Sequence, residues 1–110
     1  MANNWNIPEW LEKEIIERDV TCVYCGVEFT PSKISKKTAA SWEHIINNAQ
    51  IITRDNIARC CFSCNASKGA KDLSVWINSN YCKSKRITKS TVSPVVKRAL
   101  QNGSKLEKGI

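Results

Sequence analysis

The sequence has one histidine, no long apolar run and no recognisable export signal, and each of these shortages excludes a class of protein. With His44 alone, one chain cannot build a site that needs two histidines, such as a two-histidine zinc finger or a His-Glu-x-x-His metalloprotease. No segment approaches the roughly 20 apolar residues of a membrane-spanning helix, so we expect no membrane partner. Residues Met1–Trp10 lack the basic start and apolar stretch of a secretory signal, so we expect a reducing, intracellular location.

The chain is short, and its charge is unevenly distributed. A length of 110 residues predicts one domain with a small core, which a metal ion or disulfides often stabilise. Residues 1–31 hold six acids and two bases, net −4, whereas residues 32–110 hold fifteen bases and four acids, net +11. An excess of this size suggests a polyanionic partner, most often nucleic acid, although a solubilising lysine surface would give the same counts.

Local patterns divide the chain into an N-terminal helical extension (1–19), a core (20–80) and a basic C-terminal extension with a short helix (81–110). Pro8 and an apolar stripe from Trp10 to Ile15 predict the first helix, ending near Asp19. In the core we expect a strand and tight turn at 20–27, a loop at 30–38, and strands at 40–46 and 56–60. Helices should run from Phe62 to Gly69 and, after a cap at Asp72, through Trp76 to Asn80. Residues 83–89 read as a connector, 95–101 as a helix ended by Asn102-Gly103, and 104–110 as a frayed tail.

Four of the six cysteines form two Cys-x-x-Cys knuckles, at Cys22 and Cys25 and at Cys61 and Cys64. Two intervening residues let both thiolates reach one ion from a single turn, and two such turns complete a tetrahedron around Zn²⁺. In a reducing compartment such pairs are more often metal ligands than disulfides, with disulfides or unligated core thiols as the alternative. A closed four-thiolate site leaves no position for water, so the predicted zinc ion is structural.

The two remaining cysteines, Cys60 and Cys82, are predicted to be buried small apolar residues and not ligands. As the strand neighbour of Cys61, Cys60 should point to the opposite face of its strand. Neither cysteine is therefore expected to take part in the zinc site.

Three strings of residues around the knuckles occur in an order that resembles the HNH endonuclease family. They are Trp42-Glu-His-Ile-Ile, Asp55-Asn-Ile-Ala-Arg-Cys and Cys61-Phe-Ser-Cys-Asn-Ala-Ser-Lys-Gly. The resemblance covers about residues 20–80 and is to the variant in which two zinc knuckles frame the motif. It implies an α+β fold, a small zinc-stabilised ββα-metal domain with flanking helices, and an endonuclease that hydrolyses DNA phosphodiester bonds.

The same resemblance implies a catalytic set of His44, Asn56 and Asn65. His44 matches the general base and is the only side chain here whose ordinary pKa lies near neutrality. The alternative is a structural histidine whose polar atoms are hydrogen-bonded within the core. Glu43 and Asn65 match the ligands of a catalytic ion, and oxygen ligands suit Mg²⁺ or Mn²⁺. Glutamate departs from the usual aspartate or histidine, and Asn65 could instead cap a helix. Asn56 matches a structural position whose amide holds the loop 47–55.

Double-stranded DNA is the partner that the resemblance implies, and basic side chains are the candidate contacts. Lys68 lies about one helical turn after Asn65 and is expected to touch a phosphate or to remain solvated. The other candidates, some of which could contact bases, are Arg54, Arg59, Lys71, Lys83, Lys85 and Arg86. The loop lysines Lys33, Lys36 and Lys37 could extend the same path.

The resemblance implies a metal-dependent endonuclease, and within that class we expect site-specific cleavage of restriction type, which as a homodimer could cut both strands. Within the nuclease class, the alternatives are a homing nuclease and a phage nicking or packaging nuclease, in the cytoplasm of a bacterial or phage-infected cell. Two further classes stay open. One is a non-catalytic zinc module that binds DNA, and the other is a zinc-stabilised module that binds protein through the acidic N-terminal helix.

Overall fold

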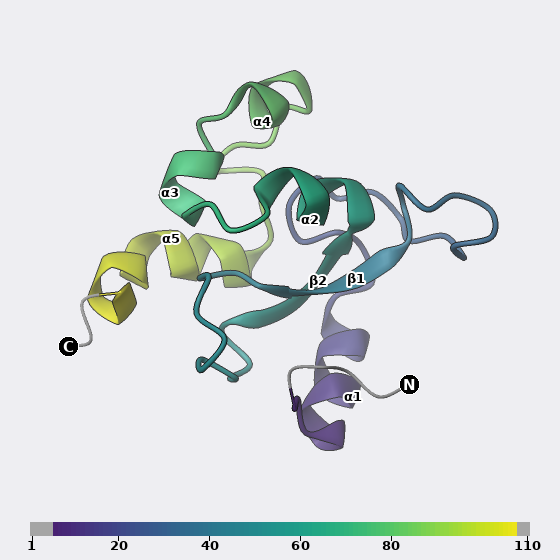
Figure 1. Cartoon of the computed structure of the whole chain (residues 1–110), viewed down its shortest axis with the longest axis horizontal. Coiled ribbons are helices and arrows are strands. Elements are labelled where there is room, and N and C mark those ends of the chain that lie inside the picture. Colours follow the sequence, from purple (N-terminus) through teal and green to yellow (C-terminus); the bar gives the residue numbers. More distant parts are fainter. Residues whose placement is uncertain (1–5, 108–110) are drawn as a thin grey trace.

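The centre of the fold is a two-stranded antiparallel hairpin, seen in a computed structural model that describes residues 6–107 (Figure 1). Strand β1 (Ala40–His44) pairs with β2 (Ile57–Cys61) in a register that places Glu43 opposite Ala58 and His44 opposite Ile57. Helix α2 (Phe62–Lys68) follows β2 directly and packs against both strands. The predicted α+β class and the strand-strand-helix order of the core are therefore confirmed.

Helix α1 (Glu9–Arg18) lies on the other side of the hairpin from α2 (Figure 1). Its buried side chains Leu11 and Ile15 form a small apolar cluster with Ile57 of β2. Asp19, which is buried just after the helix, accepts hydrogen bonds from the Arg18 guanidinium at 2.7 and 2.8 Å and from the backbone N–H of Arg59 at 3.1 Å. These contacts hold the N-terminal helix firmly against β2.

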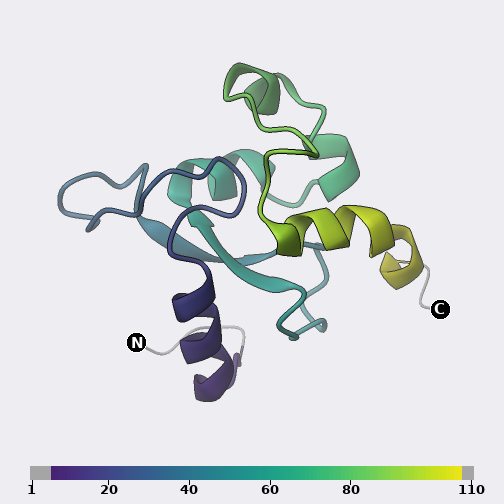
Figure 2. The same ribbon diagram turned by 180° about the vertical axis from the view of Figure 1, so that it is seen from behind.

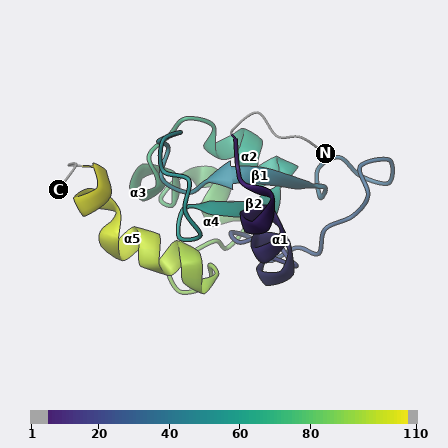
Figure 3. The same cartoon turned by 90° about the horizontal axis from the view of Figure 1, so that it is seen from below.

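The main core lies on the α2 side, where three further helices cover it: α3 (Leu73–Trp76), α4 (Asn80–Ser84) and α5 (Pro94–Glu107). Trp76 is fully buried, with its ring edge-on to Tyr24 at 4.8 Å and stacked on Tyr81 at 6.0 Å between centroids. Helix α5 runs from beside the hairpin toward one end of the molecule (Figure 2 and Figure 3). No helix among the described residues is long and apolar enough to cross a membrane.

Several element boundaries differ from those predicted. The expected strand near residue 20 is a turn closed by a single bridge between Thr21 and Glu28. β1 ends at His44 and not at Ile46, because the Asn56 side chain accepts the N–H of Ile46 and donates to its carbonyl, so these groups do not pair with a strand. Asp72 precedes α3 but makes no side-chain capping hydrogen bond.

The C-terminal third differs most. The predicted helix through Trp76 to Asn80 is interrupted, because Ser79 accepts a hydrogen bond from Cys82 N–H at 3.3 Å and caps the separate helix α4. Part of the expected connector 83–89 is thus helical. Helix α5 continues through Asn102-Gly103 to Glu107, since a helical glycine costs only about 1 kcal/mol relative to alanine and does not by itself end a helix. Of the tail expected to fray, residues 108–110 lie outside the described residues.

Candidate functional site

The two knuckles bring four thiols into one cluster that could hold a metal ion. The Sγ atoms of Cys22, Cys25, Cys61 and Cys64 all lie within 4.8 Å of one another, and those of Cys25 and Cys61 are 3.8 Å apart. Sulfur ligands at the usual Zn–S distance are separated by about 3.8 Å in a tetrahedron. The cluster therefore fits a structural zinc site, as the spacing predicts.

The local backbone explains why both knuckles point at one position. Gly26 adopts a left-handed φ of 77° and donates its N–H to the carbonyl of Cys22 at 3.0 Å, which folds the first turn back on itself. In the second knuckle, Cys61 ends β2 and caps α2, accepting the N–H of Cys64 on its sulfur at 3.4 Å. The contacts with the other three thiols bring the pKa of Cys22 to about 7. The contact with Cys25 raises this pKa, and the contacts with Cys61 and Cys64 lower it.

Two tyrosines complete the surroundings of the cluster, although no sequence motif predicts them. The Tyr81 hydroxyl donates to Cys64 Sγ at 3.3 Å and lies 2.9 Å from Ser63 Oγ. Tyr24 stands between the two cysteines of the first knuckle and is buried, with 1 % of its surface exposed. Its position between two clustered cysteines is the only signal in the sequence that it faces the core.

Cys60 and Cys82 are buried and lie outside the cluster of four, as expected. The Cys60 sulfur lies 3.7 Å from Ser41 Oγ across the hairpin. Burial raises the pKa of both thiols, so they stay protonated and unreactive near neutral pH.

Glu43 belongs to a buried carboxylate network, formed with Tyr24 and Lys68. Its Oε2 atom accepts the Tyr24 hydroxyl at 2.6 Å and lies 3.1 Å from Lys68 Nζ. Glu43 is 5 % exposed and Lys68 is 1 % exposed. Burial raises the pKa of Glu43, against the opposing effects of the Lys68 charge and the Tyr24 hydrogen bond. A buried carboxylate without such partners would be strongly destabilising.

This placement differs from the expectation for Lys68, which was a phosphate contact or a solvated side chain. The residue is the last of α2, and it turns inward because the helix packs over β1, where the buried carboxylate attracts its ammonium group. The same ammonium donates to the backbone carbonyl of His44 at 3.3 Å. In this conformation Lys68 is not part of the surface.

His44 ends β1 and is largely buried. Burial, and after it the positive charge of Lys68, lowers the pKa of the imidazole below its ordinary value. The ring is therefore neutral at pH 7, the state in which it can accept a proton.

Asn65 and Asn56 hold the segments on either side of His44. The Asn65 amide nitrogen donates to Ser41 Oγ and to the Trp42 carbonyl, both at 3.0 Å, which ties α2 to β1. Because Cys61 caps this helix, the capping alternative for Asn65 is wrong. Asn56 accepts the Ile46 N–H at 2.7 Å and donates to the carbonyls of Ile46 and Ile51, so its amide holds the loop 47–55.

The remaining candidate DNA contacts occupy different surroundings. Arg54 forms a bidentate contact with Glu14 of α1 at 2.6 and 3.0 Å, and the half-buried Arg59 guanidinium lies 5.1 Å from the ring centroid of Phe29 and 5.9 Å from that of Trp42. Lys71 is exposed and donates to the Ser67 carbonyl at 3.0 Å. Arg54 and Arg59 are thus already engaged by the protein's own side chains.

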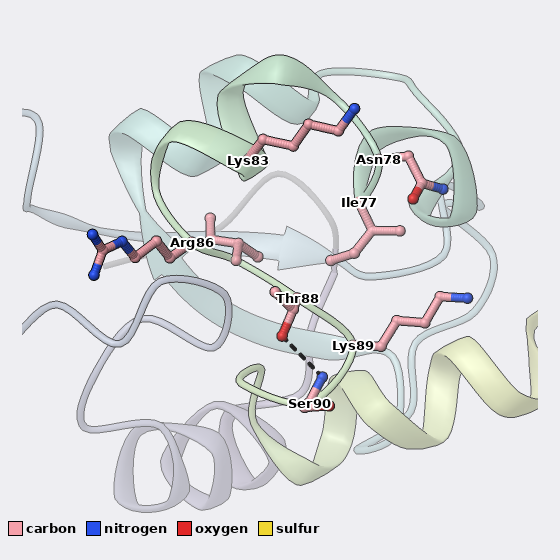
Figure 4. A pocket seen from close by; sticks show the side chains of 8 residues that line it. Ile77, Asn78, Lys83, Arg86, Thr88, Lys89 and Ser90 are labelled. Atoms are coloured by element: carbon pink, nitrogen blue, oxygen red, sulfur yellow. Dashed lines mark hydrogen bonds between the residues drawn. The ribbon is translucent and has the colours of Figure 1, made fainter.

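Lys83, Lys85 and Arg86 are exposed on and just after α4. Lys83 and Arg86 line a surface pocket together with Lys89, but the Arg86 side chain extends away from the two lysines (Figure 4). The three charges do not converge on one point, so the pocket is an extended basic surface and not a site for a single anion.

Comparison of the chain with protein-family models, with curated proteins and with solved structures found no match.

Proposed function

We propose that this protein is a zinc-stabilised, metal-dependent DNA endonuclease of the HNH type. The observation that supports this most directly is the joining of α2 to the end of β1, through Asn65 to the Trp42 carbonyl and Lys68 to the His44 carbonyl. These contacts hold α2 against the segment of β1 that carries Glu43 and His44. Phosphodiester hydrolysis requires a base for water and hard oxygen donors for a divalent ion.

His44 is the proposed general base. Its lowered pKa keeps the imidazole able to take a proton from the attacking water. Asn56 acts indirectly, because its hydrogen bonds to Ile46 and Ile51 fix the loop that follows the histidine. The hydrogen bond from Lys68 to the His44 carbonyl fixes the same backbone from the helix side.

The oxygen atoms of Glu43 and Asn65 are the proposed ligands of Mg²⁺ or Mn²⁺. Both contacts to the Glu43 carboxylate fall on Oε2, and Asn65 contacts β1 through its amide nitrogen, which leaves Glu43 Oε1 and Asn65 Oδ1 as candidate donor atoms. A carboxylate with an amide oxygen fits a hard cation. When bound, the ion would stabilise the charge that develops on the phosphate.

The proposed partner is double-stranded DNA, and exposed bases on two segments support this. Lys33, Lys36 and Lys37 lie in the loop before β1, which projects from the body of the molecule (Figure 1). Lys83, Lys85, Arg86 and Lys89 lie on and after α4. Contacts of this kind to the phosphate backbone would make binding strongly salt-dependent.

The test is cleavage of supercoiled plasmid by protein that carries one zinc ion per chain, with Mg²⁺ or Mn²⁺ added. We expect wild-type protein to produce open circles or discrete linear fragments, and His44→Ala to produce neither while keeping its zinc and its circular dichroism spectrum. Lys13→Ala, a change at an exposed lysine of α1 that is not among the candidate DNA contacts, is the matched control and should still cut. Cleavage by His44→Ala at the wild-type rate would contradict the assigned base.

One observation favours a second candidate function, a non-catalytic zinc module that binds DNA. The Glu43 charge is already balanced by Lys68 at 3.1 Å, as expected of a structural ion pair. This alternative predicts that wild-type protein and His44→Ala bind duplex DNA equally well and that neither cuts it with any divalent ion. Gel-shift and plasmid assays on the same two proteins decide between the two functions.

A further inference from the structure

The Glu43 carboxylate has a cation beside it before any metal ion binds. Lys68 Nζ lies 3.1 Å from Oε2, and the two side chains are almost completely enclosed between α2 and β1. The pair has no net charge. A divalent ion added to it would bring two further positive charges next to a buried ammonium group, and like charges at such short range repel strongly in a poorly hydrated site.

We propose that Lys68 competes with the catalytic ion for the Glu43 carboxylate, and that Lys68 leaves Glu43 when DNA phosphates bind. This inference rests on the proposed function and concerns how the site is regulated. With DNA bound, Glu43 and one phosphate carry two negative charges, which balance a divalent ion. Lys68 is then free to pair with a neighbouring phosphate. DNA and the divalent ion therefore bind cooperatively, and the free protein holds the ion weakly.

The position of Lys68 allows this exchange without a change of fold. It is the last residue of α2, and the exposed Gly69 follows with φ of 51°. Besides Glu43, its ammonium group contacts the His44 carbonyl at 3.3 Å. Glu43 keeps the Tyr24 hydroxyl at 2.6 Å when the lysine leaves, so its carboxylate stays oriented. Only the flexible lysine side chain needs to move.

The coupling can be measured without cleavage. The probe is Mn²⁺, whose free aqueous ion is counted by electron paramagnetic resonance during titration of zinc-loaded protein. All proteins carry His44→Ala, so that DNA stays intact. We expect a short duplex to tighten Mn²⁺ binding about 5- to 100-fold, the usual size of a coupling between sites. By the same linkage, Mn²⁺ should tighten DNA binding by the same factor.

Substitution of Lys68 tests whether its positive charge is the competitor. Lys68→Met removes the charge with little change of shape, and we expect Mn²⁺ to bind tightly without DNA and to gain little when DNA is added. Lys13→Met makes the same charge change at an exposed lysine of α1, outside the candidate DNA contacts, and should behave like the parent. Equal or weaker Mn²⁺ binding by Lys68→Met, compared with the parent, would overturn the inference. Mn²⁺ binding that Glu43→Gln does not abolish would overturn it as well, because the ion would then not bind at Glu43.

A second measurement needs no substitution at Lys68, in case that variant fails to fold. In protein labelled with ¹⁵N-lysine, a buried ammonium paired with a carboxylate exchanges its protons slowly and gives a separate resonance. We expect this resonance to shift or disappear when Mg²⁺ and duplex are both added, and to remain with Mg²⁺ alone. Persistence with both present would contradict the exchange. If the wild-type protein does not cut plasmid although the Mn²⁺ and ¹⁵N-lysine results are as expected, the proposed function is rejected and this inference stands.

Discussion

The four-cysteine cluster and the buried carboxylate network are two polar sites in one small core, but they are assembled differently. The cluster takes its four sulfur atoms from two short turns, so the spacing of cysteines along the chain predicts it. The network joins Tyr24, Glu43 and Lys68 from three separate segments. Spacing cannot reveal it, because its members meet only after α2 has packed over β1. A site whose residues lie within short turns can be predicted from the sequence, whereas a site whose residues come from separate helices and strands cannot.

The two sites also touch. Tyr24, which donates to Glu43, lies between the two cysteines of the first knuckle. Its ring packs on Trp76, which stacks on Tyr81, and the Tyr81 hydroxyl donates to a sulfur of the second knuckle. The aromatic side chains therefore connect both knuckles to the carboxylate, so that the cysteine cluster and Glu43 share one packed set of contacts.

Loss of a zinc ligand should have the largest effect. Cys61→Ser removes a sulfur at the junction of β2 and α2, and we expect the protein to lose its zinc and its fold. Structural zinc contributes on the order of 10 kcal/mol or more in small domains, comparable with the whole stability of a protein this size. Circular dichroism and zinc analysis measure both changes. Cys82→Ala, a buried cysteine outside the cluster, should keep one zinc ion; a folded Cys61→Ser protein without zinc would contradict the structural role of the ion.

Breaking the buried ion pair should have the second largest effect. Lys68→Ala leaves Glu43 buried without its cation, and we expect it to destabilise the zinc-loaded protein by about 3–5 kcal/mol. Replacing both partners, in Glu43→Gln with Lys68→Met, should recover much of this loss because no unpaired charge remains. Urea unfolding at fixed zinc measures the difference. Equal stability of Lys68→Ala and wild type would show that the pair is not buried in solution.

Removing the hydrogen bond between the two sites should have a smaller effect. Tyr24→Phe keeps the ring packed on Trp76 and deletes only the hydroxyl that donates to Glu43 at 2.6 Å. A hydrogen bond to a charged group contributes about 1.5–3 kcal/mol, so unfolding should be easier by that amount. Zinc stoichiometry should stay at one per chain. Loss of zinc from Tyr24→Phe would mean that the tyrosine supports the cluster and not the carboxylate.

The pH dependence of His44 gives a smaller effect. Burial, followed by the Lys68 charge, lowers the imidazole pKa below 6.5 in the folded protein. The stability that this provides is complete above pH 6.5 and is lost as the pH falls through the folded pKa. With one histidine in the chain, a single proton resonance reports this titration. A folded pKa above 6.5 would contradict the burial, and Lys68→Met should move the pKa upward.

The smallest effect is expected at the protein surface. Arg54→Ala removes the exposed ion pair with Glu14, and exposed pairs contribute little because water screens them. Unfolding of this variant should match wild type within experimental error. A large loss would mean that the contact between α1 and the loop before β2 matters more than the apolar cluster around Ile57.

The sequence was sufficient to predict the knuckles, the hairpin and α2, because each depends on residues near one another in the chain. It also predicted that Asn56 would hold its loop, a role that the three hydrogen bonds of its amide now describe. The inward turn of Lys68 could not be predicted, since a helical lysine is usually solvated and only the buried carboxylate of β1 explains its burial. The break before α4 depends on Ser79, whose capping role competes with the continuation of a helix.

The central proposal is that the end of β1, and not the four-cysteine cluster, carries the chemistry. The direct measurement is plasmid cleavage by protein held at one zinc ion per chain while the Mg²⁺ concentration is varied. We predict cleavage that rises with Mg²⁺ at constant zinc content and disappears in His44→Ala. The absence of cleavage with both Mg²⁺ and Mn²⁺, or cleavage that does not change in His44→Ala, would contradict the proposal.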